Sequence, residues 1–134
     1  MNKSELKKVN WMNSTMSVGI EKIDDQHKNF LDITNNAIDA ILSDNQSAVA
    51  NTLKELKEYA HYHFKTEADL MAEHEYPESG SHHNAHIDFH DKVAELENAE
   101  GEAREAELVS FMQNWLVRHI SSTDKKLANY INRQ

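Results

Sequence analysis

Apolar residues recur every three or four positions in four long stretches of this chain, and polar side chains interrupt each of these stripes. In one stretch the stripe runs from Leu56 through His63 to Glu67. Steps of three and four residues place side chains on one face of an α-helix, which is the face that packs into a core. The pattern therefore predicts amphipathic helices whose buried faces carry histidine and carboxylate groups.

The polar side chains in these stripes form one set of five histidines and two carboxylates. Burying a polar group without a partner is costly, so each histidine would need a buried partner in so small a core. Bound metal supplies such a partner for all of them at once. We therefore expect a shared metal site made by His27, His63, Glu67, His82, His86, His119 and Asp124.

The number and type of these side chains indicate two metal ions. Seven donors are too many for a single octahedral ion. Imidazole and carboxylate ligands suit iron, manganese, cobalt or zinc better than calcium or magnesium. If both carboxylates and one hydroxide bridge a pair of ions, the histidines divide three and two. The ion with two histidines then keeps an open position, as a binding or catalytic site requires.

The composition favours a single domain made of helices. The 134 residues include only 3 Gly and 1 Pro, and long stretches are rich in Ala, Leu, Glu and Lys. Short connections between long helices predict an all-α fold, an antiparallel up-down-up-down four-helix bundle. The expected elements of this domain, which spans 1–134, are an irregular N-terminal arm over about 1–23 and helices over about 24–43, 47–74, 81–98 and 103–132.

Local signals set the expected ends of these elements. Asp24 or Asp25 can cap the free amides at the start of the first helix, and Tyr76-Pro77 stops the second. The arm is expected to pack across the bundle through apolar anchors, namely Trp11, Met16, Val18, Ile20 and Ile23.

Charge and cysteine content exclude several classes of partner. The formal net charge of −9 argues against nucleic acid, because its phosphates would be repelled. With 0 Cys the chain has no thiolate ligands, so any metal is held by nitrogen and oxygen. The N-terminal residues lack the apolar segment of a signal peptide, and no stretch approaches the ~20 apolar residues of a membrane span. We therefore expect a cytoplasmic protein without a membrane partner. The sequence does not identify a protein partner.

Short motifs along nearly the whole chain resemble those of a known family. They are Trp11, Met16-Ser17-Val18-Gly19-Ile20, Ile23-Asp24-Asp25-Gln26-His27-Lys28, His63-Phe64-Lys65-Thr66-Glu67, Tyr76-Pro77, then His82, His86, Phe89, Trp115-Leu116, His119-Ile120 and Asp124. On these residues the chain resembles the single-domain bacterial hemerythrins. The resemblance implies a four-helix bundle that binds dioxygen reversibly at a non-haem di-iron centre, for storage, delivery or sensing, and is not an enzyme.

The resemblance also implies a role for each site residue. His82, His86 and His119 would hold the coordinatively full iron, and His27 and His63 the iron with the open position. Glu67 and Asp124 would bridge the two irons together with an oxo or hydroxo group. A mostly apolar pocket would protect bound oxygen from water, and its candidate lining residues, which could equally be ordinary core, are Phe30, Phe64, Trp115, Leu116 and Ile120.

Some residues lie outside this pattern. Glu58, His61, His83 and His90 fall off the stripes and are assigned to the surface, whereas His74 is expected at the end of the bundle. Many family members carry Tyr three residues after the bridging Asp, where this chain has Leu127. The residues also leave two alternative functions open: a di-iron redox enzyme acting on peroxide or nitric oxide, and an iron-storage module.

Overall fold

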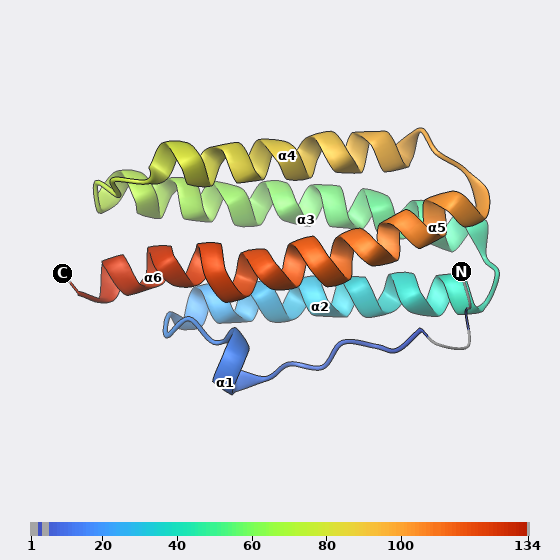
Figure 1. Ribbon diagram of the computed structural model, residues 1–134, viewed down its shortest axis with the longest axis horizontal. Coiled ribbons are helices and arrows are strands. Elements are labelled where there is room, and N and C mark those ends of the chain that lie inside the picture. Colours follow the sequence, from blue (N-terminus) through green and yellow to red (C-terminus); the bar gives the residue numbers. More distant parts are fainter. Residues whose placement is uncertain (1–2, 4–5, 134) are drawn as a thin grey trace.

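Four long helices run antiparallel to one another and form a bundle (Figure 1). The computed structural model describes residues 3 and 6–133. After a short helix α1 (Asn13–Met16) the long helices are α2 (Glu21–Leu42), α3 (Gln46–Glu73), α4 (Ser79–Glu97) and a fourth made of consecutive segments. These segments are α5 (Gly101–Ser110), η2 (Phe111–Leu116), η3 (His119–Asp124) and α6 (Lys125–Asn132). The predicted all-α, up-down-up-down bundle is confirmed.

The start of α2 differs from the expectation that Asp24 or Asp25 would cap it. The helix begins at Glu21, and its N-cap residue Ile20 makes no side-chain cap bond. Asp24 lies in the first turn and reaches back along the chain: its Oδ1 accepts from the Val18 amide at 2.8 Å, and its Oδ2 accepts from the Ser17 hydroxyl at 2.6 Å. The prediction that Asp24 or Asp25 caps the helix is therefore wrong. The Asp24 carboxylate instead accepts hydrogen bonds from the segment that precedes α2.

The N-terminal arm packs along the bundle through most of its predicted anchors. Met16 and Val18 are buried, while Trp11 and Ile20 are partly buried. The side-chain amide of Asn35 in α2 pairs with the Val9 backbone, accepting from its N–H at 2.7 Å and donating to its carbonyl at 2.9 Å. The arm is less irregular than expected, since it contains the single turn α1, which contacts η3.

Apolar side chains fill the bundle on both sides of a buried polar centre. The larger cluster includes Phe30, Leu53, Phe89, Leu108 and Met112. Two smaller clusters lie toward the other end of the helices. One contains Val18, Ile23 and Ala128, and the other contains Met71, Tyr76 and Leu127. The polar centre is thus enclosed along the bundle axis by apolar layers. Among the described residues, no helix has the length and apolar character needed to cross a membrane.

The contacts of Asp24 predict that this residue stabilises the docked arm. Asp24→Ala removes two hydrogen bonds to a carboxylate, so we expect the free energy of unfolding to fall by about 1–2 kcal/mol. Urea denaturation at neutral pH measures the difference. The matched control is Asp25→Ala, which removes an exposed carboxylate from the next position of α2. Equal midpoints for the two variants would contradict this role of Asp24.

Candidate metal centre

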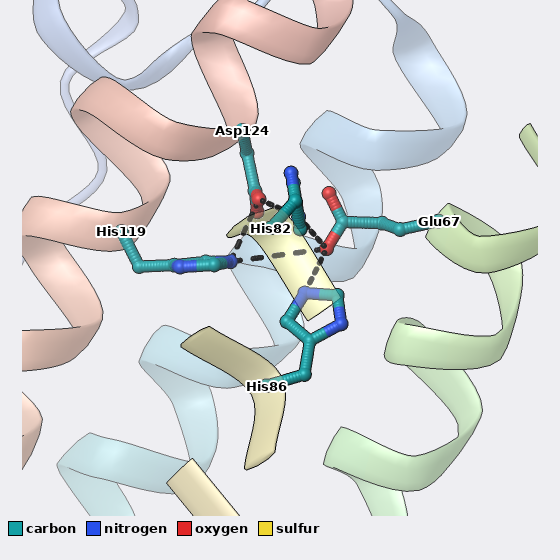
Figure 2. Close-up of side chains that lie close together, drawn as sticks. All are labelled: Glu67, His82, His86, His119 and Asp124. Atoms are coloured by element: carbon teal, nitrogen blue, oxygen red, sulfur yellow. Dashed lines mark ion pairs between the residues drawn. The ribbon is translucent and has the colours of Figure 1, made fainter. Parts of the chain in front are cut away.

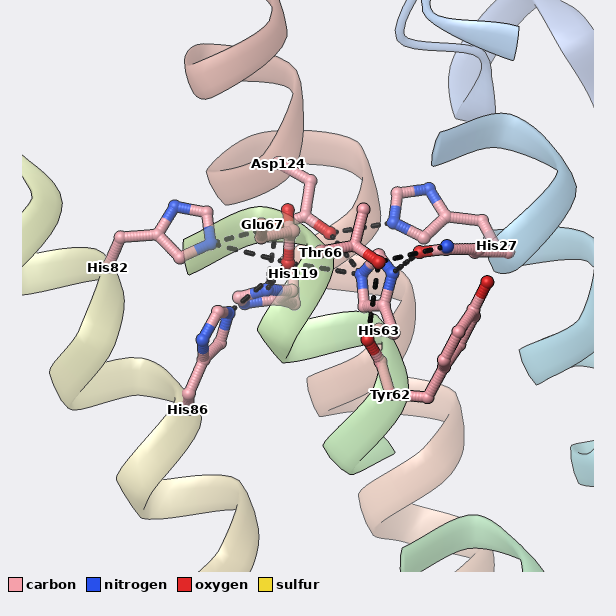
Figure 3. Close-up of polar contacts among 10 residues, drawn as sticks. His27, Tyr62, His63, Thr66, Glu67, His82, His86, His119 and Asp124 are labelled. Atoms are coloured by element: carbon pink, nitrogen blue, oxygen red, sulfur yellow. Dashed lines mark hydrogen bonds and ion pairs between the residues drawn. The ribbon is translucent and has the colours of Figure 1, made fainter. Parts of the chain in front are cut away.

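Seven side chains from all four long helices meet in the interior of the bundle (Figures 2 and 3). Each is at most 5% exposed. They come from α2 (His27), α3 (His63, Glu67), α4 (His82, His86) and η3 (His119, Asp124). The structure therefore brings together every residue of the predicted metal site.

The Asp124 carboxylate divides the histidines into two groups. Its Oδ2 lies 2.7 Å from Nε2 of His27 and 3.4 Å from Nε2 of His63. Its Oδ1 lies 2.7 Å from Nε2 of His119 and 3.2 Å from Nε2 of His82. Because each oxygen of one carboxylate faces a different group, Asp124 has the arrangement of a ligand shared by two ions.

Glu67 lies between the same two groups. Its Oε1 is 3.0 Å from Nε2 of His63 on one side and 3.2 Å from Nε2 of His86 on the other. The same oxygen is 3.5 Å from Nε2 of His82 and 3.9 Å from that of His119. Glu67 therefore contacts histidines of both groups, as a second shared ligand would.

A local change of helix geometry places His119 and Asp124 at one site. In a regular α-helix, residues five positions apart point about 140° away from each other. Segment η3, which runs from His119 to Asp124, is a π-helix, whose wider turn returns every fifth residue to nearly the same face. This π-helical segment lets both side chains of one helix reach the centre.

Several buried atoms of the centre make no well-aligned hydrogen bond with the described residues, although some of them lie close to one another. They are Oε1 and Oε2 of Glu67, Oδ1 of Asp124, Nδ1 of His27, both ring nitrogens of His82, and Nε2 of His86 and His119. Buried polar atoms without partners are rare in folded proteins because they are costly. Metal ions would satisfy them, and a donor set of imidazole nitrogen and carboxylate oxygen suits a borderline transition metal. The residues present therefore fit a metal site.

The histidines and carboxylates of the centre are electrostatically coupled. Burial opposes protonation of His63, but Glu67 and Asp124 outweigh it and raise the pKa of His63 to about 9. Burial likewise opposes protonation of His119, but Asp124 and Glu67 outweigh it and raise the pKa of His119 to about 10. Burial and mutual repulsion oppose ionisation of Glu67, yet the neighbouring histidines hold its pKa well below the usual value. The histidines and the two buried carboxylates thus stabilise each other's charged forms.

Three aromatic residues expected to line a ligand pocket contact histidines of the centre. The ring centroids are 5.2 Å apart for Phe30 and His63, 3.8 Å for Phe64 and His86, and 4.6 Å for Trp115 and His119. The other two expected residues, Leu116 and Ile120, are buried in the same apolar cluster as Phe30. Apolar side chains therefore surround part of the centre.

The remaining histidines lie outside the centre. Glu58, His61 and His83 are exposed, as expected. His90, which was expected at the surface, is partly buried, and its ring centroid lies 5.5 Å from that of Phe64. His74 is the C-terminal cap residue of α3 and thus lies at the end of the helix. Among the described residues, neither group of candidate ligands includes any of these four histidines.

Sequence reasoning missed one buried contact of the centre. Gln26, which is 5% exposed, accepts a hydrogen bond from Nδ1 of His63 through its Oε1 at 2.6 Å. A signal for its burial is present in the sequence, because Gln26 follows Ile23 by three residues and precedes Phe30 by four. No spacing rule identifies which histidine it contacts, since that partner comes from another helix.

Comparisons with known proteins agree with this geometry. The sequence model described as "Hemerythrin HHE cation binding domain" matches residues 18–131. The chain is 32% identical over 118 residues to a bacteriohemerythrin of Stenotrophomonas maltophilia, covering 87% of this chain and 77% of that protein. It is 36% identical over 117 residues to a hemerythrin-like protein of Naegleria gruberi, covering 87% and 88% of the two chains.

A solved structure has the same fold. A crystal structure of wild-type hemerythrin aligns with a TM-score of 0.82 at 26% identity, covering 92% of this chain and 97% of that one. The family match extends over most of the chain and includes all seven residues of the centre. This chain therefore belongs to the hemerythrin family.

Proposed function

We propose that this protein binds dioxygen reversibly at a di-iron centre, for oxygen storage, delivery or sensing, and that it is not an enzyme. The observation that carries the proposal is the placement of Asp124, whose two oxygens face separate groups of histidines at distances of 2.7–3.4 Å. The names of the relatives, bacteriohemerythrin and hemerythrin-like protein, support the same function.

The contacts support a specific division of the ligands. His82, His86 and His119 would hold one iron, and His27 and His63 would hold the other. Asp124, which belongs to both groups, and Glu67, which contacts His63 and His86, would bridge the two irons together with an oxo or hydroxo group. Because the first iron would have three histidines and the second only two, the second iron would have fewer protein ligands. When bound, the pair supplies two electrons and one open coordination position for a small ligand.

The surrounding side chains favour binding over turnover. Phe30, Phe64, Trp115, Leu116 and Ile120 line the ligand side of the centre in this proposal, which rests on their apolar packing and on the ring contacts to the histidines. Their role is to keep water and protons away from the bound ligand, because both promote irreversible oxidation of the metal.

The first prediction concerns metal content and reversibility. Anaerobic loading with ferrous iron should give two irons per chain, and air should produce a visible absorption band that fades on purging with argon. Metal analysis and absorption spectra measure both results. Two irons that oxidise permanently would point to a redox enzyme or an iron-storage module instead, and fewer than two irons would contradict the ligand assignment.

The second prediction concerns the iron held by three histidines. His119→Ala removes a ligand, so the affinity for this iron should fall at least by the roughly 10–100-fold seen when second-layer partners of metal ligands are lost. Competition with an iron chelator measures the change. His83→Ala, which removes an exposed histidine from α4, is the control and should bind both irons normally. Normal iron and oxygen binding in His119→Ala would refute its assignment.

The third prediction concerns the position three residues after Asp124. Leu127 is 2% exposed and packs with Met71 and Tyr76. Leu127→Tyr adds a hydroxyl one helical turn from the carboxylate, and one added hydrogen bond should slow autoxidation about 2- to 10-fold. Leu127→Phe is the control, because it adds a similar ring without the hydroxyl. Equal autoxidation rates in the two variants would show that the hydroxyl has no effect.

A further inference from the structure

A chain of hydrogen bonds leads from the backbone of α3 to one histidine of the centre. The Thr66 hydroxyl donates to the Tyr62 carbonyl at 3.3 Å, as Figure 3 shows. The Gln26 amide nitrogen donates to the same hydroxyl oxygen at 3.2 Å. Oε1 of Gln26 accepts from Nδ1 of His63 at 2.6 Å. Gln26 and Thr66 are 5% and 9% exposed, so water does not readily replace these contacts.

The Tyr62 carbonyl sets the direction of the whole chain. A carbonyl oxygen only accepts, so Thr66 must donate to it, and the Thr66 oxygen is left to accept from the Gln26 amide nitrogen. The amide consequently turns its oxygen toward His63, where it too can only accept. A neutral His63 ring must therefore carry its hydrogen on Nδ1.

This choice of ring nitrogen decides whether His63 can bind metal. With hydrogen on Nδ1, the electron pair of Nε2 is free, and this atom faces Glu67 Oε1 at 3.0 Å and Asp124 Oδ2 at 3.4 Å. If the Gln26 amide were reversed, its NH₂ group would face Nδ1 and favour hydrogen on Nε2. That form of the ring has no electron pair to offer the centre.

We propose that Gln26, directed by Thr66, is a positioning residue that holds His63 in its metal-binding form and so sets the affinity for the ion on the two-histidine side. The inference rests on the proposed function, because it needs a metal pair. The two histidines that would bind this ion come from two helices, and the Gln26–His63 hydrogen bond joins these helices: Gln26 and His27 are neighbours in α2, and His63 belongs to α3. The effect is therefore specific to one ion of the pair.

Replacing the Gln26 amide by a carboxylate should change the properties of the bound ion measurably. Gln26 accepts the hydrogen bond without adding negative charge to a centre that already contains Glu67 and Asp124. A carboxylate accepting the same hydrogen bond makes an imidazole ligand more basic. Gln26→Glu should therefore retain the second ion and lower its reduction potential, whereas Gln26→Leu should lose the contact altogether.

Anaerobic titration with ferrous iron against a competing chelator tests this inference. In Gln26→Leu the affinity for the ion on the two-histidine side should fall roughly 10–100-fold. The affinity for the ion held by three histidines should not change. Thr66→Val should lower the affinity for the same ion. The matched control is Thr52→Val: Thr52 also lies in α3, is 7% exposed and donates to the carbonyl four residues earlier at 2.8 Å, but lies outside the centre.

A second measurement follows the ring nitrogen itself. In the zinc-loaded protein, ¹H–¹⁵N NMR of the histidine rings should show hydrogen on Nδ1 of His63 in the parent and in Gln26→Glu, and this signal should be lost or shifted in Gln26→Leu. If the parent protein binds no ion pair, the proposed function fails. If the parent binds two ions and Gln26→Leu binds both with unchanged affinities, the positioning role of Gln26 is overturned while the proposed function stands.

Discussion

The two buried carboxylates, Glu67 and Asp124, are the constraint on which the rest of this structure depends. Each is at most 1% exposed, and an uncompensated charge in such a place would be strongly disfavoured. Histidines from every long helix face them, so the polar centre joins all four helices. The bundle is consequently held together by charge compensation at its centre as well as by apolar packing around it.

The apolar layers make that compensation stronger and give the centre its chemical character. Clusters of apolar side chains lie on both sides of the seven residues along the bundle, and aromatic rings contact three of the histidines. Exclusion of water lowers the local dielectric constant, which strengthens the attraction between the charges that remain. The same enclosure is consistent with the proposed reversible binding of dioxygen.

Much of the candidate centre could be predicted because helical spacing alone determines which residues share a face. His63 and Glu67 are four apart, as are His82 and His86, so each pair points inward wherever its helix packs. Pairs formed between helices could not be predicted in this way. The hydrogen bond of Gln26 to His63 joins α2 and α3, and no periodicity within either helix encodes it.

The sequence by itself determined the all-α bundle and indicated the seven polar residues of the centre. Six of these residues follow from periodicity within single helices, whereas Asp124, five residues after His119, departs from that spacing. The tertiary structure decided how these residues combine. The π-helical segment from His119 to Asp124 turns two side chains toward one centre, although regular helical spacing would separate them. It also placed one oxygen of Asp124 against each histidine group. Such contacts depend on how helices pack in three dimensions, and local sequence patterns do not specify them.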